Sequence, residues 1–161
     1  MANNDMLIAW LNDAHAMEKG IAEALEAQVK AAADHPEVQT GIQRHLETTR
    51  NHVQLVEQCL NELGEKPSAV KSGLASVTSK AQGLMMGGAK DDLVKSSLND
   101  YAAEHMEIAS YRALRLAAEE VGNAFIVGVC DQILQDEQAM ASWLEQQMPA
   151  LVREAVLTGS T

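Results

Sequence analysis

Apolar residues recur every three or four positions through most of this chain, which is the spacing of a helix that buries one face. Residues that favour turns interrupt the pattern at a few places only, namely Asp34-His35-Pro36, Gly64, Gly87-Gly88 and Val121-Gly122-Asn123. Long helices joined by such short turns must run antiparallel. The chain is therefore expected to form helical hairpins.

The amino-acid composition favours an all-α fold. Aromatic residues make up only 3% of the 161 residues and there are three prolines, while alanine, leucine, glutamate, glutamine and methionine are abundant. These abundant residues lose little side-chain freedom in a helix. A chain of this length can bury a core without a disulfide or another covalent constraint.

We expect a single domain over residues 1–161. A helical hairpin covers 4–63, a crossover with a short extra helix covers 64–89, a second hairpin covers 90–148, and a short C-terminal helix covers 149–161. The proline at 149 starts that last helix in this interpretation. Two hairpins joined by a long crossover form a ferritin-like four-helix bundle rather than a simple up-down-up-down bundle.

The charge of the chain excludes some partners. The formal net charge is −11 and the basic residues are dispersed, so the sign is wrong for binding nucleic acid or an anionic membrane. No apolar run is long enough for a membrane span, and the N-terminus does not resemble a signal peptide. Cys59 and Cys130 lie on apolar helical stripes and are expected to be reduced. We therefore expect a cytoplasmic protein.

Two carboxylates and a histidine interrupt the alanine-rich segment DYAAEHMEIASYR, residues 100–112. A helical projection places His105 on the apolar stripe and Glu104 on its flank; the stripe consists of Leu98, Tyr101, His105, Ile108 and Arg112. A buried carboxylate is costly unless it is paired, protonated or bound to a metal. Because Glu104 on the flank of the stripe is expected to point at or near the core, it needs partners on other helices.

The other helices carry candidate partners on their apolar faces. Glu18 is inward in the first helix, which also places Leu7, Trp10, Leu11, Ala14, Met17, Ile21 and Leu25 on its core stripe. Thr49 and His52 are inward in the second helix, and Glu137 is inward in the fourth. Glu47 points away from the core.

These residues partly match a di-metal carboxylate site. Such a site takes one Glu from each of two helices and a Glu-x-x-His pair from each of the other two. Glu18 and Glu104 fit the single-Glu helices, whereas the paired positions are Thr49-x-x-His52 and Glu137-x-x-Met140. The set predicts one iron or manganese ion, or two if water or Glu107 contributes.

A metal-free alternative stays open, in which the same side chains form a satisfied hydrogen-bond network. Glu107 is expected to be a solvent-facing acid near an arginine unless it serves as a secondary ligand. His105 is expected in a supporting network rather than as a ligand, and His45 is not expected to bind metal. His15 and His35 are expected to be solvated.

Four segments together resemble the YciE/YciF family of ferritin-like bacterial stress proteins, and the YciE branch most closely: LNDAHAMEK, RHLETTRNHV, EHMEIASYRAL and DEQAMASWL. The resemblance implies a cytoplasmic homodimer with a ferritin-like bundle, linked to stress responses. Glu18, Glu104, Glu107 and Glu137 match acidic positions of the family, and Thr49 matches a Thr that follows a Glu. Thr48 replaces that Glu here.

The sequence thus predicts a stress-associated ferritin-like protein that binds one or two iron or manganese ions through Glu18, His52, Glu104 and Glu137. Any reaction would involve redox or peroxide chemistry, and whether the protein is an enzyme stays open. The alternative is a non-catalytic structural or interaction module. A DNA-binding mini-ferritin is disfavoured by the negative charge, and no nucleophile or phosphate-loop motif is present.

Overall fold

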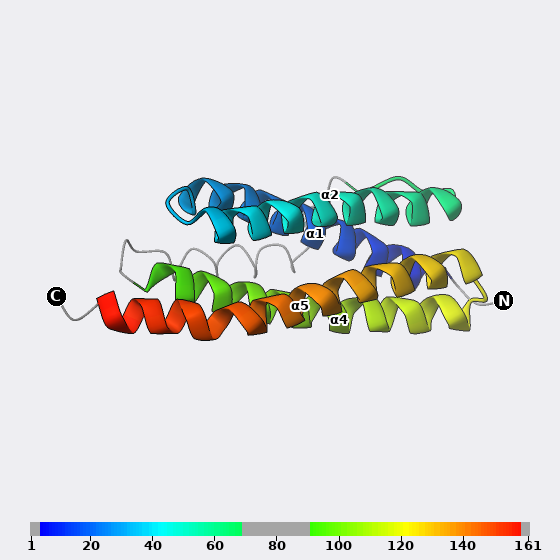
Figure 1. Ribbon diagram of the computed structural model, residues 1–161. Coiled ribbons are helices and arrows are strands. Elements are labelled where there is room, and N and C mark those ends of the chain that lie inside the picture. Colours follow the sequence, from blue (N-terminus) through cyan, green and yellow to red (C-terminus); the bar gives the residue numbers. More distant parts are fainter. Residues whose placement is uncertain (1–3, 69–90, 159–161) are drawn as a thin grey trace.

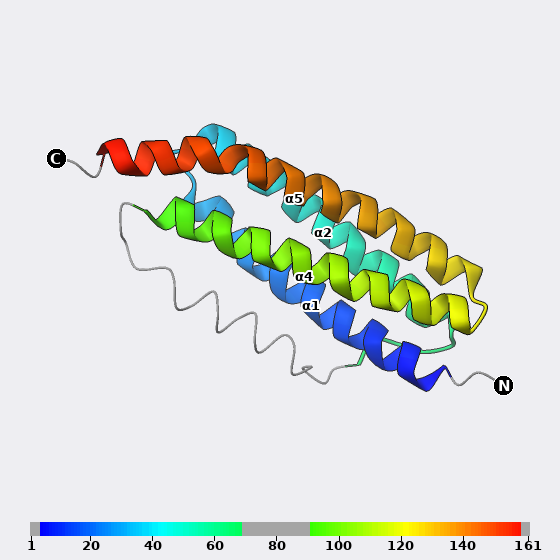
Figure 2. The same cartoon turned by 90° about the horizontal axis from the view of Figure 1, so that it is seen from below.

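The computed structural model describes residues 4–68 and 91–158, which form a four-helix bundle (Figure 1). The helices are α1 (Asp5–Ala31), α2 (Pro36–Glu62), α4 (Asp92–Glu120) and α5 (Ala124–Thr158). The α1–α2 hairpin stacks on the α4–α5 hairpin, with α1 against α4 and α2 against α5 (Figure 2). The predicted all-α, ferritin-like class is confirmed. Most of the predicted crossover lies outside the described residues.

The turns within residues 4–68 and 91–158 form where the sequence predicted them, whereas the predicted turn at Gly87-Gly88 lies outside the described residues. Pro36 stands at the start of α2, where its missing N–H is not needed. Gly64 follows α2 with a φ of 79°, and Gly122 joins α4 to α5 with a φ of 75°. Only glycine adopts such angles without steric cost, so these two residues determine where the helices end.

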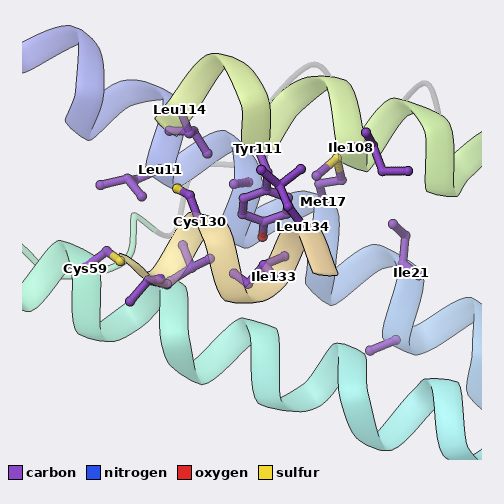
Figure 3. Packing of buried hydrophobic residues seen from close by; sticks show 14 of the residues in the cluster. Leu11, Met17, Ile21, Cys59, Ile108, Tyr111, Leu114, Cys130, Ile133 and Leu134 are labelled. Carbon is purple, nitrogen blue, oxygen red and sulfur yellow. The ribbon is translucent and has the colours of Figure 1, made fainter. Parts of the chain in front are cut away.

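The core lies between the two hairpins and consists mostly of leucine, isoleucine and small residues (Figure 3). Tyr111 of α4 enters it beside Met17 of α1 and Leu134 of α5. Cys59 and Cys130 are buried free thiols, as predicted, and burial raises the pKa of each to about 12. At neutral pH both therefore behave as small apolar side chains.

The core stripe of α1 is as predicted except at Trp10, which is 40% exposed. The buried apolar face of α1 consists of Leu7, Leu11, Ala14, Met17, Ile21, Ala22 and Leu25.

The predicted register of α4 is wrong. Leu98, His105 and Arg112 are exposed. His105 contacts Tyr101 of its own helix, with its Nδ1 3.0 Å from the Tyr101 carbonyl oxygen. The buried face consists of Ser97, Asp100, Glu104, Glu107, Ile108, Tyr111, Leu114 and Ala118. Three of these eight residues are acids and a fourth is a serine, so the apolar residues alone point to a neighbouring, incorrect stripe.

The separate C-terminal helix was also predicted wrongly, because α5 continues through Pro149 to Thr158. Pro149 removes one backbone hydrogen bond, whose acceptor would be the carbonyl of Glu145. Both residues are exposed, so that carbonyl can bind water. Leu144 and Leu151, two helical turns apart, line one pocket together with residues of α2 and α4, so α5 faces its neighbours on both sides of the proline.

A close contact joins α2 to α5 at Gly41. A Cβ atom on Gly41 would lie 2.3 Å from Cζ2 of Trp143, well inside van der Waals contact. Only glycine therefore allows the indole of Trp143 to rest on the backbone of α2.

We expect Gly41→Ala to destabilise the fold by about 1–3 kcal/mol, because the added methyl overpacks against Trp143. The free energy of unfolding in urea measures this. Gly20→Ala is the matched control: Gly20 lies inside α1 with nothing near a new Cβ, so it should gain up to about 1 kcal/mol in helix propensity. Equal effects of the two substitutions would contradict the packing argument.

Candidate metal centre

Ionisable side chains from all four helices meet in the middle of the bundle. They are Glu18 from α1, His45 and His52 from α2, Glu104 and Glu107 from α4, and Glu137 from α5, and none is more than 4% exposed. Each stands on the buried face of its helix. Helical spacing places Glu104 and Glu107 one turn apart, and His45 and His52 two turns apart.

The first group of possible ligands is Glu18, His52 and Glu137, whose ligand atoms lie within 4.8 Å of one another. His52 Nδ1 is 2.9 Å from Glu137 Oε1 and 3.7 Å from Glu18 Oε1. The hydroxyl of Tyr111 donates a hydrogen bond of 2.5 Å to Glu18 Oε1. Three helices thus direct ligand atoms at one point.

The second group is His45, Glu104 and Glu137, again with ligand atoms within 4.8 Å of one another. His45 Nε2 lies 3.0 Å from Glu104 Oε1. Glu137 belongs to both groups, so the two possible metal positions are neighbours that share one carboxylate. The Glu107 carboxylate is buried in the field of Glu137, Glu18 and Glu104.

Two close histidine–glutamate contacts in this cluster are at ion-pair distance but lack hydrogen-bond geometry. His52 Nδ1 and Glu137 Oε1 are at contact distance, as are His45 Nε2 and Glu104 Oε1, yet none of these four atoms has a hydrogen-bond partner among the described residues. Both oxygens of Glu107 and Glu104 Oε2 also lack one. Buried polar atoms are nearly always paired in native proteins, so a bound cation is the simplest way to satisfy this set.

Burial governs the charges of the cluster. Burial and the neighbouring Glu137 raise the pKa of Glu104 to about 11, and burial raises the pKa of Glu107 well above its usual value. Burial also lowers the pKa of His45 to about 4. Burial opposes a charged His52 as well, but its contacts with Glu137 and Glu18 outweigh this and raise the pKa of His52 to about 10. Without metal, the cluster therefore retains protons at neutral pH.

Asp136 supports His52 from outside the cluster. Its Oδ2 lies 3.1 Å from His52 Nε2 and can accept a hydrogen bond from that nitrogen. This arrangement keeps a proton on Nε2 and directs Nδ1 toward Glu18 and Glu137. Histidines that bind metals commonly donate their second N–H to a carboxylate in this way.

The structure brings together four residues that the sequence put forward, Glu18, His52, Glu104 and Glu137. Thr49 is buried beside them on α2. His105 is exposed and takes no part, so its expected network role is wrong.

Glu107 was expected to face solvent unless it served as a secondary ligand, but its carboxylate is buried among the other acids. His45 was not expected to bind metal, and this stays a prediction; its Nε2 contacts Glu104 within one of the two groups of possible ligands. His45 stands seven residues before His52 on one helical face, and that spacing was the available signal. His15 was expected to be solvated but is buried, with its Nε2 2.9 Å from Glu57 Oε1.

A family model described as a domain of unknown function, DUF892, matches residues 2–157. The chain belongs to this family. Protein YciF of Escherichia coli strain K12 is 26% identical over 139 residues, which are 84% of this chain and 83% of YciF. The resemblance to the YciE/YciF family is therefore confirmed.

Solved structures of similar proteins share the fold of this DUF892 member. A protein from Xanthomonas campestris pv. campestris has a TM-score of 0.84 at 33% identity, covering 98% of this chain and 99% of its own. The E. coli stress protein YciF has a TM-score of 0.84 at 22% identity, covering 95% and 99%. A Rhodobacter capsulatus bacterioferritin, with a metal-free dinuclear site and haem iron, has a TM-score of 0.76 at 19% identity, covering 98% and 95%.

We expect the metal-free protein to lose stability as the pH rises from 6.5 to 8.5. In this range folded Glu104 and His52 keep protons that the unfolded chain releases, because their pKa values are about 11 and about 10. Stability then falls by up to about 1.4 kcal/mol per pH unit for each such proton. The shifts of His45 and Glu137 act at lower pH.

Urea unfolding at several pH values after treatment with a chelator measures this slope. Glu104→Gln removes one of the retained protons and should flatten the slope. A wild-type stability that stays constant or rises over the range would contradict the protonation states given above.

Proposed function

We propose that this protein binds two iron or manganese ions side by side in the bundle, with Glu18 and His52 serving one ion, His45 and Glu104 serving the other, and Glu137 shared. The observation that carries this proposal is the set of buried histidine and glutamate atoms at contact distance that lack hydrogen-bond partners among the described residues. Glu107 is available as a further carboxylate ligand.

The donor set suits these metals. Four glutamates and two histidines are also the ligands of the di-iron and di-manganese carboxylate proteins with ferritin-like bundles. Here they are distributed differently: both histidines stand on α2, and α4 supplies Glu104-x-x-Glu107. A set dominated by carboxylate oxygens favours hard ions such as manganese and iron over copper.

The expected chemistry is redox or peroxide handling. Iron or manganese at such a site, when bound, supplies electron exchange with oxygen or peroxide. The chain's own residues would keep the site dry, hold Glu18 in place through the Tyr111 hydroxyl and orient His52 through Asp136. Burial raises the pKa of Tyr111 well above its usual value, so this phenol stays a neutral donor.

The alternative is a structural or interaction module in which the cluster never binds metal. The Tyr111–Glu18 hydrogen bond and the close pairing of His52 with Glu137 favour it, because they satisfy part of the cluster. The unpaired oxygens of Glu104 and Glu107 disfavour it, because a half-satisfied buried network is costly. Metal content separates the two functions.

We expect about two ions of iron or manganese per chain, as in the di-metal bundles, and less than half of that in Glu137→Ala, because the variant removes the shared ligand. Elemental analysis of untagged protein supplied with both metals measures this. Glu47→Ala, on the exposed face of α2, is the matched control and should keep full occupancy.

Folding of each variant is checked by circular dichroism. Metal-free wild-type protein after reconstitution, or a Glu137→Gln variant that keeps all its metal, would contradict the proposed site.

We further propose a cytoplasmic, stress-associated homodimer. The family resemblance supports the dimer and the stress role, and the E. coli relative is described as a stress protein. Large apolar side chains remain exposed on α5, among them Val152 and Leu157, and exposed apolar groups favour association. The buried free thiols of Cys59 and Cys130 fit a reducing compartment. None of the helices described here is long and apolar enough to cross a membrane.

Light scattering at micromolar concentration should give twice the 17.4 kDa mass of one chain. Leu157→Glu introduces a charge on the exposed apolar part of α5 and should shift the mass toward that of one chain. A single-chain mass for the wild-type protein would contradict the dimer.

A further inference from the structure

A cleft of about 230 Å³ is lined by residues of α2 and α5. These two helices pack against each other along one side of the bundle (Figure 2). Arg44, Thr48 and Ala139 line its outer part, and His45 and Glu137 line its inner part. Arg44 and Thr48 belong to α2, and Ala139 belongs to α5. The cleft therefore leads from the surface to a residue shared by both ligand groups.

We propose that this cleft is the route by which divalent metal ions and small polar reactants reach the buried cluster. The proposal rests on the metal-binding function proposed above. It adds the route by which ions enter and the largest size of ion or molecule that can use this route. The volume accommodates several water molecules, so a hydrated ion or a molecule of a few heavy atoms fits and a larger organic substrate does not.

Two other cavities are less suitable. The one lined by Gln28, His45 and Glu104 measures about 10 Å³, which is at most room for one water molecule. A cavity of about 160 Å³ between α1 and α4 is lined by Trp10, Met17, Leu114 and similar residues and includes no member of the cluster. Among these three, only the α2–α5 cleft is large enough and also reaches the ligands.

The outer part of the cleft carries one positive side chain, Arg44, and one negative side chain, Asp136. The side chain of Asp136 is 40% exposed, lines the cleft and contacts His52 Nε2 on its inner side. A carboxylate in this position attracts a positive ion from solvent toward the cluster. The Thr48 hydroxyl donates to the carbonyl of Arg44, which fixes this part of the α2 wall.

The inner end of the cleft is closed. His45 is 4% exposed and Glu137 is 2% exposed, so these two side chains separate the cleft from the cluster. The Trp143 indole, packed on Gly41, makes one wall rigid. Entry therefore requires a rotation of the His45 or Glu137 side chain rather than a movement of the helices.

The rate of cobalt uptake tests the route, because Co²⁺ absorbs visible light when it binds nitrogen and oxygen ligands. Stopped-flow absorbance follows loading of the full chain, and excess chelator then follows release. Thr48→Trp and Ala139→Trp fill the cleft from opposite walls. Gln138→Trp adds the same bulk at the neighbouring exposed position and is the control.

We expect both cleft variants to load and release cobalt at least about tenfold more slowly than wild type, which corresponds to a barrier higher by about 1.4 kcal/mol. Their final cobalt content should equal that of wild type, because the ligands are unchanged, and Gln138→Trp should match wild type in rate as well. Wild-type rates in both cleft variants would overturn the route while leaving the metal site intact. Absence of cobalt uptake by the wild-type protein would instead overturn the proposed metal site itself.

Discussion

The free-energy cost of burying carboxylates is the constraint on which this structure depends. Glu18, Glu104, Glu107 and Glu137 share one buried region, and the protonated His52 of α2 provides the nearest positive charge. In the metal-free protein the cost is reduced by retained protons and by the contact of His52 with Glu137. Two divalent cations would compensate the same charges more completely, because each cation can bind several oxygens at once. A cluster organised only for stability would be expected to satisfy its oxygens with donors, as Tyr111 does for Glu18.

The surrounding bundle makes this cluster possible. The rest of the core consists mainly of packed leucine, isoleucine and small residues. Burial of these apolar side chains stabilises the fold and offsets the free-energy cost of burying the polar cluster. The antiparallel hairpins direct one or two ligands from each helix at a common centre, so no loop is needed to build the site. Rigid helices hold ligand atoms more accurately than loops do. The α2–α5 side of the bundle is open to solvent, because a cleft reaches His45 and Glu137 there.

The sequence predicted the turns among the described residues and the inward position of Glu18, His52, Glu104 and Glu137. The register of α4 was nevertheless predicted wrongly, because Asp100 and Glu107 also occupy its buried face and the apolar residues alone indicate a different stripe. Because of that error, Glu107 was predicted to face solvent and His105 was predicted to lie on the core stripe. His45 was set aside because contacts between hairpins cannot be derived from the periodicity of one helix. The predicted helix boundary at Pro149 was wrong for a similar reason. Leu151 packs beyond the proline, and α5 continues through it.

The most direct test of this account is a crystal structure of the protein grown with manganese, with anomalous diffraction measured at the manganese edge. The account predicts two anomalous peaks inside the bundle, one contacted by Glu18 and His52 and the other by His45 and Glu104, with Glu137 between them. A crystal soaked to saturation that shows manganese only at surface carboxylates, or none, would contradict the central claim that these buried residues form a dinuclear metal site.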